Sequence, residues 1–199
     1  MKELELYINN PKSPKLIELK GNVVIKSSDN FGISLGKTSS KSVLKITRPN
    51  IVVDGNHASI IFLVDNLLNM DFSLIKIMPE ATSVTIKNLN IKVIVSSDKN
   101  SSRSISAIYN LARATNFENV KINMKSNSQI NLFGIRNYSD KSNLHSTKGD
   151  DVTIHNCTIN LIGNAKDFSN ECTAYGIYNE KSDSDLIVER RSHIAKALF

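Results

Sequence analysis

Three residues in the middle of the chain carry the chemical groups that polysaccharide-cleaving enzymes use. Asp150 and Asp151 are adjacent carboxylates that follow Gly149, and Arg136 precedes them by a short segment. Glycoside hydrolysis requires two carboxyl groups about 5 to 10 Å apart, one of them protonated. Adjacent residues of a strand point to opposite faces, so Asp150 and Asp151 can act together only from within a turn. An acidic turn ahead of a strand is the preferred interpretation.

A polysaccharide lyase would need a different set of groups, namely acidic calcium ligands on neighbouring strands and an arginine base. Arg136 is the candidate for this base, and Asp140, Asp150 and Asp151 are carboxylates that can approach it from a loop. No carboxylate occupies the position equivalent to Arg136 in a neighbouring repeat. The candidate catalytic residues are therefore Arg136, Asp150 and Asp151, and both catalytic interpretations are secondary.

A second set of residues has the chemistry of ligand binding. Residues 106–110, 133–137 and 175–179 share a strand pattern around a central isoleucine, and their outward side chains are expected to form two rows. The predicted ridge consists of Lys76, Tyr109, Arg136 and Tyr178, and the predicted furrow beside it consists of Ala107, Gly134 and Gly176. Rings and cations beside an open furrow suit a sugar, acidic sugars included. The alternative is that Tyr and Arg stack on one another for sheet stability.

The elements that would position these side chains follow a sequence repeat. Segments that begin at Ile86, Phe117 and Ile154 share one template: apolar, any, Asn, apolar, any, Ile, any, apolar. A looser copy spans residues 51–60. Alternation of period two on both sides of the shared Asn predicts two short strands joined by a tight bend. Asparagine suits such a bend because it tolerates unusual backbone dihedrals.

Each repeat also contains one of the ridge strands, so that three strands recur with a period typical of a solenoid. Over residues 43–179 the pattern resembles the right-handed parallel β-helix of the pectin lyase-like superfamily. Residues 53–56, Val-Asp-Gly-Asn, resemble the opening rung of such chains. The column Asn88, Asn119 and Asn156 resembles the internal asparagine ladder of that family. The resemblance implies a substrate groove along the face that carries the ridge.

The chain departs from the pectin-degrading glycosidases of this superfamily at the positions that matter for catalysis. In those enzymes the paired Asp residues lie on the first strand of a coil, and a Gly-Ile-Arg segment follows them. Here the segment 133–136 precedes Asp150 and Asp151, and the Asn-Thr-Asp and His-Gly elements are missing. The resemblance therefore implies the fold more strongly than it implies an activity.

The expected architecture is all-β, a right-handed parallel β-helix that forms a single domain over residues 1–199. Residues 1–42 are expected to form an opening coil and N-terminal cap, because an uncovered rung exposes both core and strand edge. Residues 43–185 form the repeated coils. Residues 186–199 are either a last rung or a C-terminal capping helix with Ile187, Ile194 and Leu198 on one side, and the helix is slightly preferred.

The amino-acid composition and the net charge limit the kinds of partner that the protein is expected to bind. The net charge of +6 favours polyanions, but the basic residues are spread along the 199-residue chain. Nucleic-acid binding would need a basic stripe with interleaved aromatics, and the short ridge is the one candidate. The two cysteines imply no disulfide framework; Cys157 lies in an apolar column and is expected to be inert core, whereas Cys172 opens the next coil. His57 and His193 lack a second ligand at metal spacing, so neither a metal nor a cofactor is expected.

No secretory signal and no apolar run of about 18 residues is found, so membrane insertion is not expected and a cytoplasmic or virion-associated location is the default.

We expect a non-catalytic β-helix module that binds a glycan, acidic or not, or that serves the assembly of a phage or cell-surface particle. The alternative is a glycoside hydrolase or polysaccharide lyase of the same fold, or a fragment of one. Loops 96–103 and 137–151 are expected to wall the ligand groove. The oligomeric state is left open.

Overall fold

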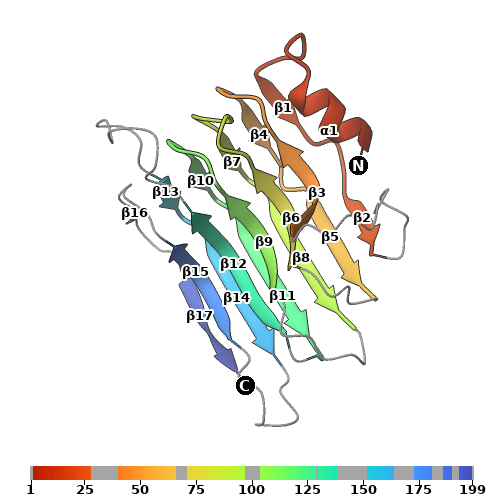
Figure 1. The fold of residues 1–199 in the computed structure, drawn as a ribbon, viewed down its shortest axis with the longest axis vertical. Coiled ribbons are helices and arrows are strands. Elements are labelled where there is room, and N and C mark those ends of the chain that lie inside the picture. Colours follow the sequence, from red (N-terminus) through yellow and green to blue (C-terminus); the bar gives the residue numbers. More distant parts are fainter. Residues whose placement is uncertain are drawn as a thin grey trace.

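The protein is an all-β parallel solenoid with one short helix (Figure 1). The computed structural model describes residues 2–27, 40–65, 71–96, 104–128, 130–138, 152–163, 173–180, 186–189 and 193–198. Within these residues the strands form three sheets of six, six and five strands, and each strand pairs in parallel with the strand three positions along in the element order. The predicted period of three strands is thereby confirmed.

The three sheets are called A, B and C. Sheet A contains, in order, β1 (Leu16–Glu18), β4 (Val52–Asp54), β7 (Thr85–Lys87), β10 (Asn116–Glu118), β13 (Val152–His155) and β16 (Leu186–Glu189). Sheet B contains β17 (His193–Leu198), β14 (Thr158–Gly163), β11 (Lys121–Ser126), β8 (Asn90–Val95), β5 (Ser59–Val64) and β2 (Val23–Lys26). Sheet C contains β15 (Ala174–Glu180), β12 (Asn131–Tyr138), β9 (Ser104–Asn110), β6 (Asp71–Ile77) and β3 (Ser40–Ile46). Stacking of equivalent strands brings like side chains into columns.

The core consists of the apolar columns that the repeat predicts. Phe117 pairs in register with Ile86 on one side and Ile154 on the other, and all three side chains are fully buried. Leu89, Val120 and Cys157 are buried as well, at the start of the sheet B half of each repeat. Burial raises the pKa of the Cys157 thiol, which keeps it protonated and is consistent with a core residue.

The bend between sheets A and B places an asparagine in the left-handed region on successive turns. The φ angles of Asn88, Asn119 and Asn156 are 50°, 53° and 51°. Asn119 donates a side-chain hydrogen bond to Asn88 at 3.2 Å, and Asn156 donates one to Asn119 at 2.5 Å. This ladder was expected to be interior, and that expectation is wrong. Asn88 and Asn119 are half-buried and Asn156 is exposed, because the bend carries them to the outer corner of the coil.

The N-terminal end of the stack is covered by α1 (Lys2–Asn9), which the sequence patterns did not predict as a helix (Figure 1). Two side chains of α1 bond to the outer edge of β3. Glu5 accepts a hydrogen bond from the Lys45 amide at 2.8 Å, and Asn9 bonds to both the Lys45 carbonyl and the Thr47 amide. The helix thus supplies partners that a preceding strand would otherwise supply, as a cap requires.

At the opposite end, residues 186–189 and 193–198 form β16 and β17. The preference for a capping helix was wrong, and the alternative of a last rung is correct. Ala, Lys and Leu are strong helix formers, but propensity differences are below about 1 kcal/mol per residue, and pairing with the backbone edges of β13 and β14 outweighs them. No helix in the described ranges is long and apolar enough to cross a membrane.

Candidate functional site

The strands of sheet C break the alternation that the sequence analysis assumed. In β6 the consecutive residues Leu74 and Ile75 both belong to the core, and in β9 the same holds for Ala107 and Ile108. Register pairing along sheet C skips the first residue of each such pair. A strand that directs two successive side chains inward must bend at that point. The same bend recurs on neighbouring strands of the sheet. The outward residue before the bend and the outward residue after it are therefore three positions apart in the sequence.

The predicted furrow of Ala107, Gly134 and Gly176 therefore does not exist on the outer face. Ala107 is fully buried. A Cβ atom added to Gly134 would lie 2.6 Å from the Ile159 side chain and 2.5 Å from the Gly176 carbonyl oxygen, so Gly134 faces the core. Gly176 occupies the equivalent position on β15, between two residue pairs that are in register with β12. The inward side of the bend is crowded at Gly134, whereas Leu74 fills the equivalent position on β6.

The predicted ridge is present as a continuous row of side chains on the outer face of sheet C. Tyr109 is in register with Lys76 on β6 and with Arg136 on β12, and Arg136 is in register with Tyr178 on β15. The Lys76 Nζ atom lies 5.3 Å from the centroid of the Tyr109 ring, and the Arg136 Cζ atom lies 5.0 Å from it. Tyr109 is thus held between two cations, an arrangement that attracts both to its ring faces. Lys45 continues the row beyond Lys76.

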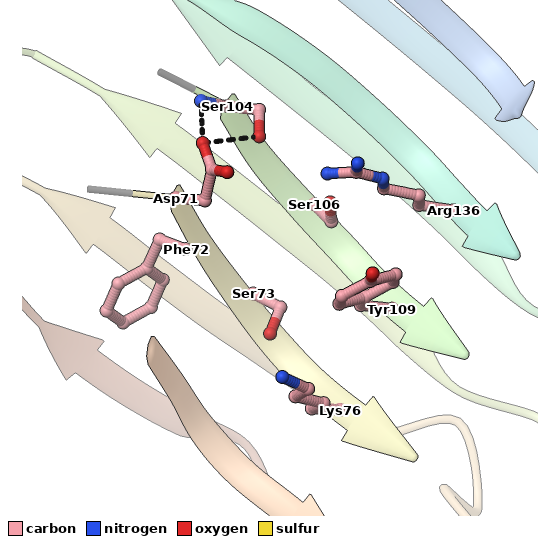
Figure 2. Close-up of a pocket in the computed structure, with 8 residues that line it drawn as sticks. All are labelled: Asp71, Phe72, Ser73, Lys76, Ser104, Ser106, Tyr109 and Arg136. Atoms are coloured by element: carbon pink, nitrogen blue, oxygen red, sulfur yellow. Dashed lines mark hydrogen bonds between the residues drawn. The ribbon is translucent and has the colours of Figure 1, made fainter. Parts of the chain in front are cut away.

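A cavity of about 230 Å³ opens beside the ridge on sheet C (Figure 2). Its lining residues come from β6, β9 and β12 and are Asp71, Phe72, Ser73, Lys76, Ser104, Ser106, Tyr109 and Arg136. Ser73 and Ser106 occupy the place that the furrow of small residues was expected to hold. Sequence reasoning missed them because they precede the bend. The cavity therefore combines hydroxyl groups, cations and an aromatic edge.

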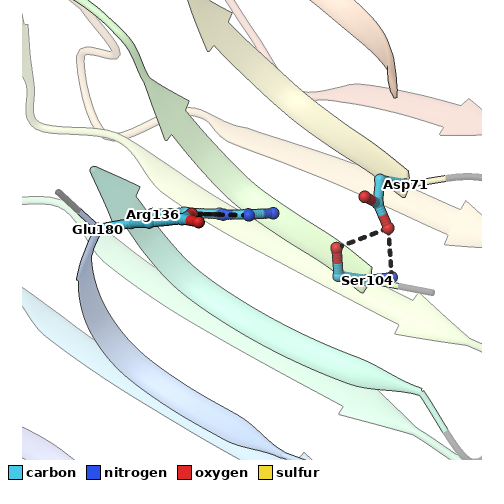
Figure 3. Close-up of polar contacts among 4 residues, drawn as sticks. All are labelled: Asp71, Ser104, Arg136 and Glu180. Carbon is cyan, nitrogen blue, oxygen red and sulfur yellow. Dashed lines mark hydrogen bonds and ion pairs between the residues drawn. The ribbon is translucent and has the colours of Figure 1, made fainter. Parts of the chain in front are cut away.

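One carboxylate, Asp71, lies among the described residues of the cavity wall. Its Oδ1 atom accepts hydrogen bonds from the Ser104 amide at 3.0 Å and from the Ser104 hydroxyl at 2.9 Å (Figure 3). These bonds join β6 to β9 at the start of both strands. Asp71 is thereby held in a defined orientation at one end of the cavity, opposite Lys76 (Figure 2).

Arg136 is paired with a carboxylate that the sequence analysis did not identify. Its Nε and Nη2 atoms donate to the same Glu180 oxygen at 3.1 and 2.7 Å, within one half-buried ion pair (Figure 3). Burial by itself lowers the pKa of Arg136, but the hydrogen bonds and charge of Glu180 outweigh it and the net effect is a raised pKa. A base must release its proton, so this environment opposes the role of lyase base for Arg136.

The other two ridge groups also have shifted pKa values. Burial and the neighbouring Lys45 charge both lower the pKa of Lys76. Burial raises the pKa of the Tyr109 hydroxyl, although Arg136 acts in the opposite direction. Tyr109 therefore stays protonated at neutral pH and can donate a hydrogen bond. An anion placed near Lys76 would reduce the repulsion that Lys45 imposes on it.

An aromatic cluster adjoins the ridge on β12 and β15. Phe133 and Tyr175 are in register and stacked, with ring centroids 5.5 Å apart, and Tyr178 lies 5.3 Å from Phe133 and 5.0 Å from Tyr175. Tyr175 is 42% exposed. Strict alternation around the central isoleucine would direct Phe133 and Tyr175 inward. The recurrence of an aromatic residue three positions before Arg136 and Tyr178 was the signal that could have located this cluster.

Several predicted residues lie outside the described parts of the chain. Asp150 and Asp151 are among them, as are Asp140, Cys172 and most of the two loops expected to wall the groove. Within the described ranges, no group of three or more His, Cys, Asp or Glu side chains is placed to hold a metal ion.

A second hollow, of about 580 Å³, lies on sheet B and is lined by Lys92, Val93, Ile94, Asn123, Met124, Lys125, Asn127, Asn160 and Ile162.

Comparison with known proteins found no relative: no family model, no curated protein and no solved structure matches the chain.

Proposed function

We propose that the protein is a non-catalytic β-solenoid module that binds an acidic glycan on the outer face of sheet C. The observation that carries the proposal is the cavity in which Lys76, Tyr109 and Arg136 stand beside the hydroxyl groups of Ser73 and Ser106. Hydroxyls and cations satisfy the polar groups of an acidic sugar, and Tyr109, which Lys76 and Arg136 hold between them, offers its edge and its hydroxyl. The remaining strands serve to hold these side chains in a rigid row.

The same cavity favours binding over catalysis. Glycoside hydrolysis requires two carboxyl groups across the scissile bond, and Asp71 is the one carboxylate among the described residues that line the cavity. Glu180, the next carboxylate along the face, is held by Arg136. The fold and the ridge support a place in the right-handed, pectin lyase-like class of β-helices. Such a module would serve as the glycan-facing part of a phage or cell-surface particle.

The proposal is tested by calorimetry of the protein with polygalacturonate, alginate and hyaluronan. Lys76→Met keeps the length of the side chain but removes its charge, and it is expected to weaken binding by about 1 kcal/mol and to reduce its salt dependence. Lys92→Met removes a matched lysine from the outer face of sheet B and should leave the affinity unchanged. If all three polymers fail to bind the folded protein, the proposal is wrong.

The enzymatic alternative is tested with the same polymers. Assays for reducing ends report hydrolysis, and assays for unsaturated products report elimination. The proposal predicts neither product. Turnover that Asp71→Asn, Asp150→Asn or Arg136→Ala abolishes would replace the binding module with an enzyme of the same fold.

A further inference from the structure

The outer face of sheet C changes from cationic at β3 to aromatic at β15. At one end, Lys45 and Lys76 are neighbours in register and bring two cations together. At the other end, Phe133, Tyr175 and Tyr178 form a cluster of rings with centroids 5.0 to 5.5 Å apart. The first end suits an anionic group, and the second suits the apolar face of a sugar ring.

Arg136 connects the two ends. Its Cζ atom lies 5.0 Å from the centroid of Tyr109 in the cavity and 5.3 Å from the centroid of Phe133 in the aromatic cluster. The cavity and the cluster are therefore neighbouring parts of one surface. Because Glu180 neutralises Arg136, this middle position carries little net charge. An arginine and a carboxylate held side by side offer donors and an acceptor, which is the combination that adjacent sugar hydroxyls require.

We infer that the ligand is a mixed glycan, with an acidic residue at the Lys45–Lys76 end and a neutral residue stacked on the cluster of Phe133, Tyr175 and Tyr178. This inference rests on the proposed function and specifies its ligand. A homopolymer of uronic acids would place a carboxylate on the aromatic cluster, where the negative faces of the rings disfavour an anion. A neutral glycan would lack a group that the positive charges of Lys45 and Lys76 attract.

The distance between the two ends sets a minimum ligand length. Three strand spacings separate β6 from β15, and at about 4.8 Å each they span about 14 Å. A single sugar residue cannot reach both ends, whereas a short oligosaccharide can. Affinity is therefore expected to rise steeply between a disaccharide and a tetrasaccharide, and to level off once both ends are occupied.

The test compares three sets of size-matched oligosaccharides by calorimetry. Hyaluronan fragments alternate acidic and neutral residues, oligogalacturonates are acidic throughout, and cello-oligosaccharides are neutral. The hyaluronan tetrasaccharide or hexasaccharide is expected to bind at least about 5-fold more tightly than either homopolymer of the same length. Equal or tighter binding of the oligogalacturonates would overturn the inference while leaving the proposed function intact.

Variants locate the two ends. Tyr175→Ala removes an exposed ring without altering the core, and it is expected to abolish the advantage of hyaluronan while leaving oligogalacturonate binding unchanged. Lys76→Met is expected to weaken binding of both acidic sets. Tyr7→Ala, which removes a tyrosine of similar exposure from α1, serves as the matched control. Unchanged hyaluronan binding by Tyr175→Ala would show that the cluster is only structural.

The failure of this inference and the failure of the proposed function give different results. If the proposed function is wrong, none of the three sets binds, and Lys76→Met has no measurable effect. If only the present inference is wrong, acidic ligands still bind in a manner that depends on Lys76, but neutral residues and Tyr175 contribute nothing.

Discussion

Two asparagine ladders of three residues each run along the described part of the solenoid, and they differ in burial and in backbone conformation. The inner ladder follows the ridge by one position: Asn110 donates to Asn137 at 2.8 Å, and Asn137 donates to Asn179 at 2.9 Å. The outer ladder of Asn88, Asn119 and Asn156 lies at the bend between sheets A and B. One is next to the candidate site, and the other is on a different corner of the coil.

The burial and the backbone conformation of the two ladders show that they have different structural roles. Asn110 and Asn137 are 0% and 1% exposed, and the Asn110 amide also bonds to Ala112 and Thr115. These amides satisfy buried polar groups that have no access to water. Asn119, by contrast, is half-buried with a φ of 53°, and its main contribution is to adopt a backbone conformation that most residues avoid. The structural role of a stacked asparagine therefore depends on whether its side chain is buried.

The largest effect is expected from Asn137→Ala in the middle of the inner ladder. The substitution removes the acceptor for Asn110 and the donor to Asn179 at once, leaving one N–H of the buried Asn110 amide without its acceptor. We expect a loss of about 3 kcal/mol in the free energy of unfolding, measured by urea denaturation. Because Arg136 precedes Asn137, glycan affinity should fall as well. A loss below about 1 kcal/mol would contradict the distinction between the ladders.

The next effect is expected from Gly134→Ala on the same strand. The new methyl group would meet the Ile159 side chain and the Gly176 carbonyl at less than 3 Å, so β12 and β15 must shift. We expect a destabilisation of about 2 kcal/mol. Gly163→Ala on β14, where an added Cβ meets no atom within 4 Å, is the matched control and should be close to neutral. Equal stability of the two variants would show that sheet C does not bend inward at Gly134.

A smaller effect is expected from substitutions of Asn119 in the outer ladder. Asn119→Ala combines the lost hydrogen bonds with an unfavourable positive φ, for an expected cost of about 1 kcal/mol. Asn119→Gly loses the same bonds without the steric penalty, so it should cost less. Glycan binding should be unchanged in both, since the bend is remote from sheet C. If alanine and glycine are equivalent, the side-chain bonds rather than the backbone conformation dominate the outer ladder.

The smallest effect concerns Asp54, which extends the outer ladder toward the N-terminus by accepting a hydrogen bond from Asn88 at 3.1 Å. Burial raises the pKa of Asp54, but hydrogen bonds from Asn56, Asn88 and Lys87 outweigh it and lower the pKa below the usual 3.8. A lowered folded-state pKa contributes stability that is present above the unfolded pKa and is lost as the pH falls through the folded one.

Urea unfolding followed from about pH 6 to about pH 2 measures this contribution. Asp54→Asn should flatten part of the acid-induced loss of stability, by a fraction of a kcal/mol given the partial exposure of the ion pair with Lys87. An identical pH profile for the variant and the parent protein would show that the outer ladder gains nothing from its terminal carboxylate.

The sequence repeat is sufficient to predict the solenoid and most of its register. The columns of Phe117 and of Asn119 could be predicted because in-phase copies of a period-two pattern have only one parallel arrangement that buries every apolar position. The ridge could be predicted for the same reason. Its residues occupy identical positions in successive copies, so stacking must bring Tyr109, Arg136 and Tyr178 together.

The side chains that surround the ridge, in contrast, could be assigned only once the packing of the coil was known. Alternation cannot show that Gly134 and Ile135 both point inward, since that bend depends on the space left by the sheet B core. The exposure of Tyr175 follows from the same bend, whereas the ion pair of Arg136 with Glu180 depends on how two side chains of neighbouring strands orient. The last rung likewise forms as strands because β13 and β14 offer backbone partners there. These features depend on contacts between residues far apart in the chain, and a local pattern contains no information about such contacts.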